Sequence, residues 1–208
     1  MFQAYVFLLL ICLTIFLINR KKLPPYFIYL GWLVAVTIVF EPLKMYLSKR
    51  NVSYNPLNHL YQFIELWLLC LTYYNYFSIK VLKKIILITL AVLTLAYPLI
   101  SFFLEGMYND CNLSFLINSI LMIIFSMVFF YDLYITNTEI KVLSFGFFWI
   151  NCGNLIFTCG TFFQMGLYSY LKNLNPQMAN DLYTINHVLN YFLYFTYAAG
   201  FLCTKQTS

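Results

Sequence analysis

Charged side chains are scarce in this chain of 208 residues. Asp, Glu, Lys and Arg make up 9% of the chain, against about 25% in soluble domains, while hydrophobic residues make up 62%. The longest gap between apolar runs is residues 168–184, far below the roughly 50 residues that a small domain needs. We therefore expect no attached kinase, ATPase or DNA-binding module.

Several chemical signatures are also missing. The basic residues behind the net charge of +5 stand apart near the ends of apolar runs, so we expect no nucleic-acid partner. Only Cys111 of the six cysteines lies outside an apolar run, and no metal-binding spacing occurs. No nucleophile elbow, zincin, P-loop or dinucleotide motif is present, and residues 185–203 hold no lysine for a retinal. We expect no cofactor and no metal, and we favour a role other than catalysis.

Seven apolar runs fill almost all of the chain. Each is close to the length of about 20 residues that a helix needs to cross a bilayer. The runs cover residues 2–19, 26–46, 57–77, 85–104, 113–133, 145–167 and 185–203. They predict one all-α domain over residues 1–208, a polytopic bundle of seven transmembrane helices. Pro98 lies inside the fourth run and should kink it, a feature that membrane helices tolerate.

Lysine and arginine predict an N-terminus outside and a C-terminus inside. No basic residue precedes the first run and Arg20 follows it at once, an order typical of an uncleaved first helix. The predicted inner segments hold eight of the twelve basic residues: Arg20, Lys21, Lys22, Lys80, Lys83, Lys84, Lys141 and Lys205. The outer side holds Lys44, Lys49, Arg50 and Lys172, and its segment between runs four and five carries Glu105 and Asp110 without a basic residue.

Polar side chains gather in the predicted outer half of the membrane. In the third run, Asn58, Gln62 and Glu65 are spaced i, i+4 and i+7, so they share one helical face. Ionisable groups in hydrocarbon are costly and usually face a bundle interior or water. The candidate ligand-binding residues are Glu41, His59, Gln62, Glu65, Gln164, Asn186, His187 and Asn190, and Asn118 adds to the same layer.

Two interpretations of this layer are open. It either forms a polar pocket that opens to the outside, or it supplies hydrogen bonds that hold helices together and cap their ends. Glu65 lies deepest and needs a partner, for which His59 and His187 are the candidates. In the sixth run, Gly146, Gly153 and Gly160 repeat at intervals of seven. This repeat predicts a close packing seam, or a seam that slides in a conformational change.

Three strings carry a resemblance to a known family. They are residues 58–65 (NHLYQFIE), residues 148–153 (FWINCG) and residues 185–190 (INHVLN) continuing through Gly200 to Cys203. They resemble a family of small, functionally uncharacterised bacterial seven-helix membrane proteins. The resemblance implies seven helices and a bacterial inner-membrane location, and it supplies no catalytic residues.

The leading hypothesis is a non-enzymatic sensor or receptor-like module. Its outward-facing pocket would lie between the second, third, sixth and seventh helices and would take a small molecule or an ion from outside. A cytoplasmic signalling partner would read the inner loops. The first alternative is a channel or transporter that uses Glu65, and its sign would be polar residues continuous from outside to inside. The second is an intramembrane lipid-modifying enzyme, which needs His59, His187 and Glu65 around one metal.

Overall fold

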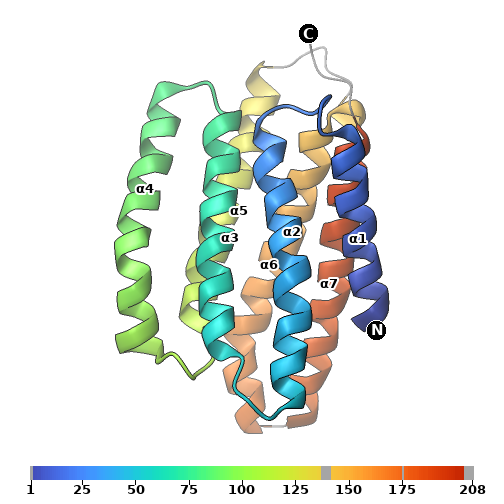
Figure 1. Cartoon of the computed structure of the whole chain (residues 1–208). Coiled ribbons are helices and arrows are strands. Elements are labelled where there is room, and N and C mark those ends of the chain that lie inside the picture. The colour runs from blue at the N-terminus through green and yellow to red at the C-terminus, as the bar shows by residue number, and fades with distance from the viewer. Residues whose placement is uncertain (1, 137–141, 175, 204–208) are drawn as a thin grey trace. The chain divides into compact units, whose positions relative to one another are not determined.

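The computed structural model describes residues 2–136, 142–174 and 176–203, without the side chains of residues 2, 136, 168–176 and 178–183. Within these ranges the fold is all-α and has no strand, as predicted from the apolar runs (Figure 1). The helices are α1 (Phe2–Asn19), α2 (Tyr26–Lys49), α3 (Asn55–Tyr76), α4 (Lys80–Leu99), the π-helical segment η1 (Ile100–Glu105), α5 (Asn112–Thr136), the 3₁₀ turn η2 (Val142–Ser144), α6 (Gly146–Leu174) and α7 (Pro176–Leu202). Lys141 and Lys205, which count toward the predicted inner charge, lie outside the described residues.

Three helical segments are long and apolar enough to cross a membrane. They are Tyr26–Lys49, the continuous segment Lys80–Glu105 and Asn112–Ile135, and a shorter apolar helix covers Gln3–Asn19. The chain is therefore a membrane-associated helical protein. Seven spans, and the orientation derived from basic residues, stay predictions.

The predicted apolar runs match some helices better than others. Helix α1 begins and ends where its run does, whereas α6 and α7 continue through most of the predicted gap at residues 168–184. Proline at the first position of a helix removes an N–H that would be unpaired in any case, and Pro176 begins α7. Polar residues in this stretch end the apolar pattern without ending the helices.

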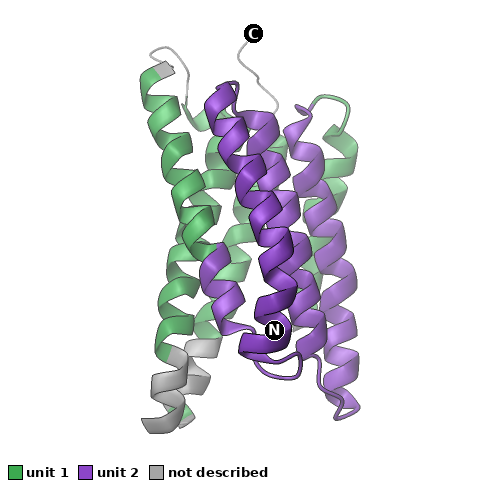
Figure 2. Ribbon diagram, turned by 90° about the vertical axis from the view of Figure 1, so that its left-hand side faces the viewer, with its two compact units in different colours: residues 1–22, 119–208 green, residues 23–118 purple. Residues whose placement is uncertain are grey.

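The chain divides into two compact units (Figure 2). Unit 1 contains residues 1–22 and 119–208, and unit 2 contains residues 23–118. Unit 1 therefore holds α1, most of α5, α6 and α7, while unit 2 holds α2, α3, α4, η1 and the first turns of α5.

The core of unit 1 is the pair of neighbouring helices α6 and α7. A Cβ at Gly153 would lie 1.9 Å from the hydroxyl oxygen of Thr196, and a Cβ at Gly160 would lie 2.5 Å from Leu189 Cδ1. Side chains at these two glycines would therefore collide with α7. The predicted packing seam is confirmed at both positions. Nothing in the structure tests whether it slides.

Aromatic contacts join α1 to α7 in the same unit. The ring of Tyr5 meets Tyr191 and Tyr194 edge-on, with centroids 6.0 and 5.8 Å apart. Near the other end of α1, the ring of Phe16 lies 5.2 Å from that of Phe201. The two helices are thus in contact along most of the length of α1.

In unit 2, α3 packs against both α2 and α4. The hydroxyl groups of Thr37 and Tyr61 form a buried hydrogen bond of 2.9 Å between α2 and α3. The rings of Phe63 and Tyr97 meet between α3 and α4, with centroids 5.7 Å apart. Pro98 lies inside α4, and because proline has no N–H, the α-helical ladder is interrupted there. Two residues later the chain changes to the π-helical turns of η1.

Candidate functional site

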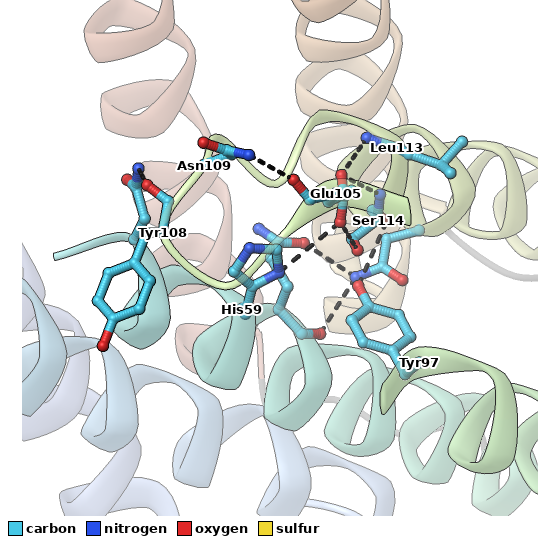
Figure 3. Close-up of polar contacts among 10 residues, drawn as sticks. His59, Tyr97, Glu105, Tyr108, Asn109, Leu113 and Ser114 are labelled. Carbon is cyan, nitrogen blue, oxygen red and sulfur yellow. Dashed lines mark hydrogen bonds and ion pairs between the residues drawn. The ribbon is translucent and has the colours of Figure 1, made fainter. Parts of the chain in front are cut away.

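A buried polar cluster in unit 2 occupies the ends of three elements (Figure 3). The first turns of α3 supply His59 and Gln62, the last residue of η1 supplies Glu105, and the start of α5 supplies Ser114 and Asn118. We call these five residues the unit 2 cluster. The side chains of His59, Gln62 and Asn118 are buried, and that of Glu105 is only 6% exposed. These elements meet because Gly106 and the short loop that follows turn the chain from η1 into α5.

Glu105 holds the beginning of α5. One carboxylate oxygen accepts hydrogen bonds from the backbone N–H groups of Leu113 and Ser114, at 2.6 and 3.2 Å. The other oxygen accepts the hydroxyl of Ser114. The first N–H groups of a helix have no partner within it, and a negative charge there also complements the helix dipole. Glu105 therefore caps α5 from eight residues away along the chain.

The turn before this cap is fixed by glycine. Gly106 has a φ of 81°, a left-handed conformation that side chains rarely adopt. The amide of Asn109 then donates a hydrogen bond of 2.8 Å to the backbone carbonyl of Glu105. This local geometry turns the Glu105 side chain toward α5.

His59 faces the same carboxylate. Its Nδ1 lies 3.7 Å from Glu105 Oε2, a distance within ion-pair range but beyond a hydrogen bond. The side chain is 3% exposed, and neither ring nitrogen has a hydrogen-bond partner within the described parts of the chain. A buried polar atom without a partner is costly, so His59 stands out from the cluster around it.

Gln62 and Asn118 join α3 to α5. The Asn118 amide donates to the side-chain oxygen of Gln62 at 2.9 Å and to its backbone carbonyl at 3.1 Å. The prediction that Asn118 belongs to the same layer as Gln62 is confirmed. The side-chain oxygen of Asn118 is buried without a hydrogen-bond partner in the described chain. It is the third unpaired polar atom of the unit 2 cluster.

Tyr97 and Cys111 border the cluster. The Tyr97 hydroxyl donates to the backbone carbonyl of Ser114 at 3.3 Å, which ties α4 to the start of α5. Burial raises the pKa of the Cys111 thiol to about 12, and the nearby charge of Glu105 acts in the same direction. The thiol is therefore uncharged near neutral pH.

Glu65 does not meet a histidine in unit 2. The carboxylate within ion-pair range of His59 is Glu105, so His59, one of the two candidate partners of Glu65, is not paired with it. Six residues separate His59 from Glu65, which places them about 120° apart around α3. Glu65 is half-buried and has no hydrogen bond or ion pair among the described residues.

The charges that act on Glu65 come from α2. Lys44 and Glu41 form an ion pair there, and both act electrostatically on the Glu65 carboxylate. The Lys44 ammonium also lies 5.2 Å from the centre of the Tyr61 ring, which is on α3. Glu65 thus belongs to the contact between α2 and α3, and its carboxylate also acts electrostatically on Tyr97, which borders the unit 2 cluster.

The other predicted site residues belong to unit 1. Gln164 is buried on α6, and its amide nitrogen and oxygen have no hydrogen-bond partner in the part of the chain that is described. On α7, the Asn190 amide donates to the side-chain oxygen of Asn186 at 3.2 Å, and His187 is exposed. Because the predicted pocket needs helices of both units, it stays a prediction. The sequence predicts a site between α2, α3, α6 and α7, whereas the polar contacts observed within unit 2 join α3, η1 and α5.

Helix α6 carries a second polar feature. Five buried polar residues follow one another at intervals of three or four: Asn151, Asn154, Thr158, Thr161 and Gln164. Most bond to their own helix, as when Thr158 donates to the carbonyl of Asn154 at 2.6 Å. The Tyr197 hydroxyl of α7 donates to the Asn154 side chain at 2.7 Å. We call these five residues the α6 polar row.

No set of three or more His, Cys, Asp or Glu side chains is placed to hold a metal within the described ranges. The metal site of the lipid-modifying hypothesis would need His59 and Glu65 from unit 2 and His187 from unit 1. No observed contact supports that set.

Comparison with known proteins finds no similarity: no protein-family model, curated protein or solved structure matches the chain. The resemblance to small bacterial seven-helix membrane proteins therefore stays a prediction.

Proposed function

We propose that this chain is a membrane protein with seven spans that acts as a sensor or receptor-like module. Its N-terminus is outside, its C-terminus is inside, and the membrane is the inner membrane of a bacterium. One observation carries the sensor role. The unit 2 cluster holds three polar atoms, two on His59 and one on Asn118, that are buried without hydrogen-bond partners in the described chain.

The proposed orientation puts this cluster on the outer side. Two loops lie near the cluster: residues 50–54, just before α3, and residues 106–111, between η1 and α5. Both are outer loops in this topology. A ligand from outside that satisfies the unpaired atoms of His59 and Asn118 binds one arrangement of α3 and α5 better than another. Only such a difference in affinity allows a ligand to shift a conformational equilibrium. A cytoplasmic partner then reads the inner ends of the helices.

A thermal-shift screen tests the sensor role. The full chain, reconstituted in nanodiscs, is screened against small polar compounds, and the unfolding midpoint is recorded for the native protein, His59→Gln and His187→Gln. The native chain has only two histidines, so His187→Gln is a matched control in the other unit. We expect at least one compound to raise the midpoint of the native protein and of His187→Gln but not of His59→Gln. A screen in which every stabilising compound acts equally on all three would refute a sensor site at the unit 2 cluster.

Fusions test the topology separately. Green fluorescent protein matures inside a bacterial cell, whereas alkaline phosphatase is active only outside the inner membrane. We expect a fusion after Ser208 to be fluorescent with the former and inactive with the latter. A phosphatase inserted in the loop between η1 and α5, at Asn109, should be active. The opposite pattern at either position would reject the proposed orientation.

The α6 polar row supports a second candidate function, transport of an ion or small solute. From Asn151 to Gln164 the row extends about 20 Å along α6, two thirds of the roughly 30 Å hydrocarbon core. A transport path requires polar residues that continue from the outer side toward the inner side, and the α6 polar row supports such a path. Flux of potassium, protons and glycerol into proteoliposomes tests it, with Asn154→Leu as the variant that blocks the row. Equal flux in protein-containing and empty liposomes would dismiss this candidate.

A further inference from the structure

We propose that the ligand of the unit 2 cluster is a small cation that carries N–H groups, an ammonium ion or a primary amine. The proposal rests on the sensor role proposed above and names the ligand class of that same site. It follows from the hydrogen-bonding groups left over in the cluster, from its charge and from the small separation of its members.

The surplus groups are mostly acceptors. The Asn118 side-chain oxygen is an acceptor without a partner in the described chain. A neutral imidazole has one donor nitrogen and one acceptor nitrogen. In the tautomer that carries its proton on Nε2, Nδ1 is an acceptor that faces the Glu105 carboxylate 3.7 Å away with no donor to satisfy it. A ligand that pairs both leftover acceptors must donate at least two hydrogen bonds.

The charge of the cluster selects a cation. Glu105 is the only carboxylate of the cluster, and all of its hydrogen bonds in the described chain come from neutral groups, those of Leu113 and Ser114. A neutral His59 gives this carboxylate no counter-charge, and Lys44 is already paired with Glu41 on α2. A buried charge without a counter-ion is costly. A cationic ligand therefore gains both hydrogen bonds and an ion pair.

The separation of His59 and Glu105 limits the ligand's size and links its binding to movement. A nitrogen that donates to two acceptors at about 2.8 Å with a tetrahedral angle needs them about 4.6 Å apart. The observed separation is 3.7 Å, so a cation that bridges these two groups must part them by about 1 Å. Such a step would move the start of α3 away from the end of η1, and it would give the sensor its second state.

Binding is tested with methylammonium chloride, using the full chain in nanodiscs of zwitterionic lipid. Potassium chloride and tetramethylammonium chloride at equal concentration are the controls, because both supply a cation without N–H groups. A ligand near 100 times its Kd should raise the unfolding midpoint by about 5 °C or more. We expect that rise with methylammonium in the native protein and in His187→Gln, and none with the two control salts.

Two variants separate binding from misfolding. His59→Gln should weaken the methylammonium response at least tenfold in apparent Kd. Asn118→Asp should strengthen it about tenfold, because it puts a full negative charge where the unpaired oxygen lies. The Gln62 side-chain amide can turn to donate to the new carboxylate, while the hydrogen bond to the Gln62 backbone carbonyl is lost. A gain of affinity cannot come from a damaged fold.

The outcomes distinguish this proposal from the sensor role. Equal responses to methylammonium and potassium, or an unchanged response in His59→Gln, overturn the N–H cation. If the compound screen still finds a His59-dependent ligand of another class, the sensor role stands and only the ligand class fails. If neither experiment finds a His59-dependent response, both fail together.

Discussion

The two units of this protein use their buried polar groups in opposite ways. In unit 1, the hydroxyls of Thr158 and Thr161 donate to carbonyls of their own helix, and the contact of α6 with α7 depends on glycines that let the helices approach closely. In unit 2, buried polar groups bond between elements far apart in sequence, as Asn118 does with Gln62 and Thr37 with Tyr61. Unit 1 combines close backbone packing with the hydrogen bond of Tyr197 to Asn154 between α6 and α7, whereas unit 2 relies more on hydrogen bonds between its elements.

This contrast matters for function because the two kinds of contact respond differently to a ligand. Close packing resists small displacements, since interiors are packed at high density. Hydrogen bonds between helices can be exchanged for bonds to a ligand at little net cost. A ligand-responsive site is therefore expected in unit 2, and a rigid frame in unit 1.

The largest effect is expected from Gly200→Ala in unit 1. The new Cβ would lie 2.8 Å from the backbone carbonyl oxygen of Gly146 and 2.7 Å from Ile150 Cγ1. A backbone carbonyl cannot rotate away as a side chain can, so α6 and α7 must separate. We expect a loss of about 3 kcal/mol in the free energy of unfolding, measured by chemical denaturation in detergent micelles.

Gly166→Ala is the matched control on α6. A Cβ at Gly166 would meet nothing within 4 Å, and alanine favours a helix over glycine. We expect this variant to be as stable as the native protein or slightly more stable. Equal losses at Gly200 and Gly166 would show that helix propensity, rather than close packing, governs unit 1.

An intermediate effect is expected from Glu105→Ala in unit 2. The change leaves the first N–H groups of α5 without their acceptor, and charge-assisted hydrogen bonds of this kind contribute about 1.5–3 kcal/mol. We expect a loss of about 2 kcal/mol in the free energy of unfolding. Hydrogen exchange should become faster at the amides of Leu113 and Ser114 before it does elsewhere in unit 2.

Asp110→Ala is the control for this prediction. Asp110 belongs to the same outer segment and is exposed, so its removal should change the free energy of unfolding by less than about 0.5 kcal/mol. If hydrogen exchange at the Leu113 amide is unchanged in Glu105→Ala, then Glu105 does not cap α5.

Sequence patterns predicted position along a helix better than direction around it. Each of the described helices α1 to α7 overlaps one apolar run, and counting residues from the run ends placed Gln62 and Asn118 in one layer, where they form a hydrogen bond. The same count also placed His59 near Glu65, but the two point to different neighbours of α3. Depth follows from the number of residues, whereas direction depends on packing that one sequence does not reveal.

Glu105 was missed as a site residue for a related reason. It comes directly after the fourth apolar run, where an acidic residue is usually a solvated loop residue. Its role depends on the π-helical turns after Pro98 and on the left-handed Gly106, which aim it at α5. Proline inside a run, followed by Glu-Gly and then a new helix, is the sequence signal that could have indicated it. Similarly, apolarity located the apolar parts of α6 and α7 but not their ends, because a helix continues through polar residues as readily as through apolar ones.

The smallest effect is expected from a pair of threonines, one in each unit. Thr37 and Thr158 are both buried, and each hydroxyl donates to a carbonyl of its own helix, at 2.9 and 2.6 Å. Thr37 also bonds across to α3, through a hydrogen bond of 2.9 Å with the hydroxyl of Tyr61. Valine keeps the shape of threonine and removes the hydroxyl. We expect Thr37→Val to cost about 1 kcal/mol, since hydrogen bonds between membrane helices average about 0.6 kcal/mol with a maximum near 1.7.

Thr158→Val should change the free energy of unfolding by only a few tenths of a kcal/mol, because a threonine that bonds to its own helix adds little to its stability. The two variants are compared by steric trapping or by denaturation in the same micelles, with Tyr61→Phe as the partner change for Thr37. In a double-mutant cycle, Thr37→Val and Tyr61→Phe should be non-additive by about the energy of one hydrogen bond. Additive effects there, or an equal cost at Thr158, would mean that unit 2 is held by packing as unit 1 is. The unpaired atoms of His59 and Asn118 would then lie in a rigid core rather than in a region that a ligand can rearrange.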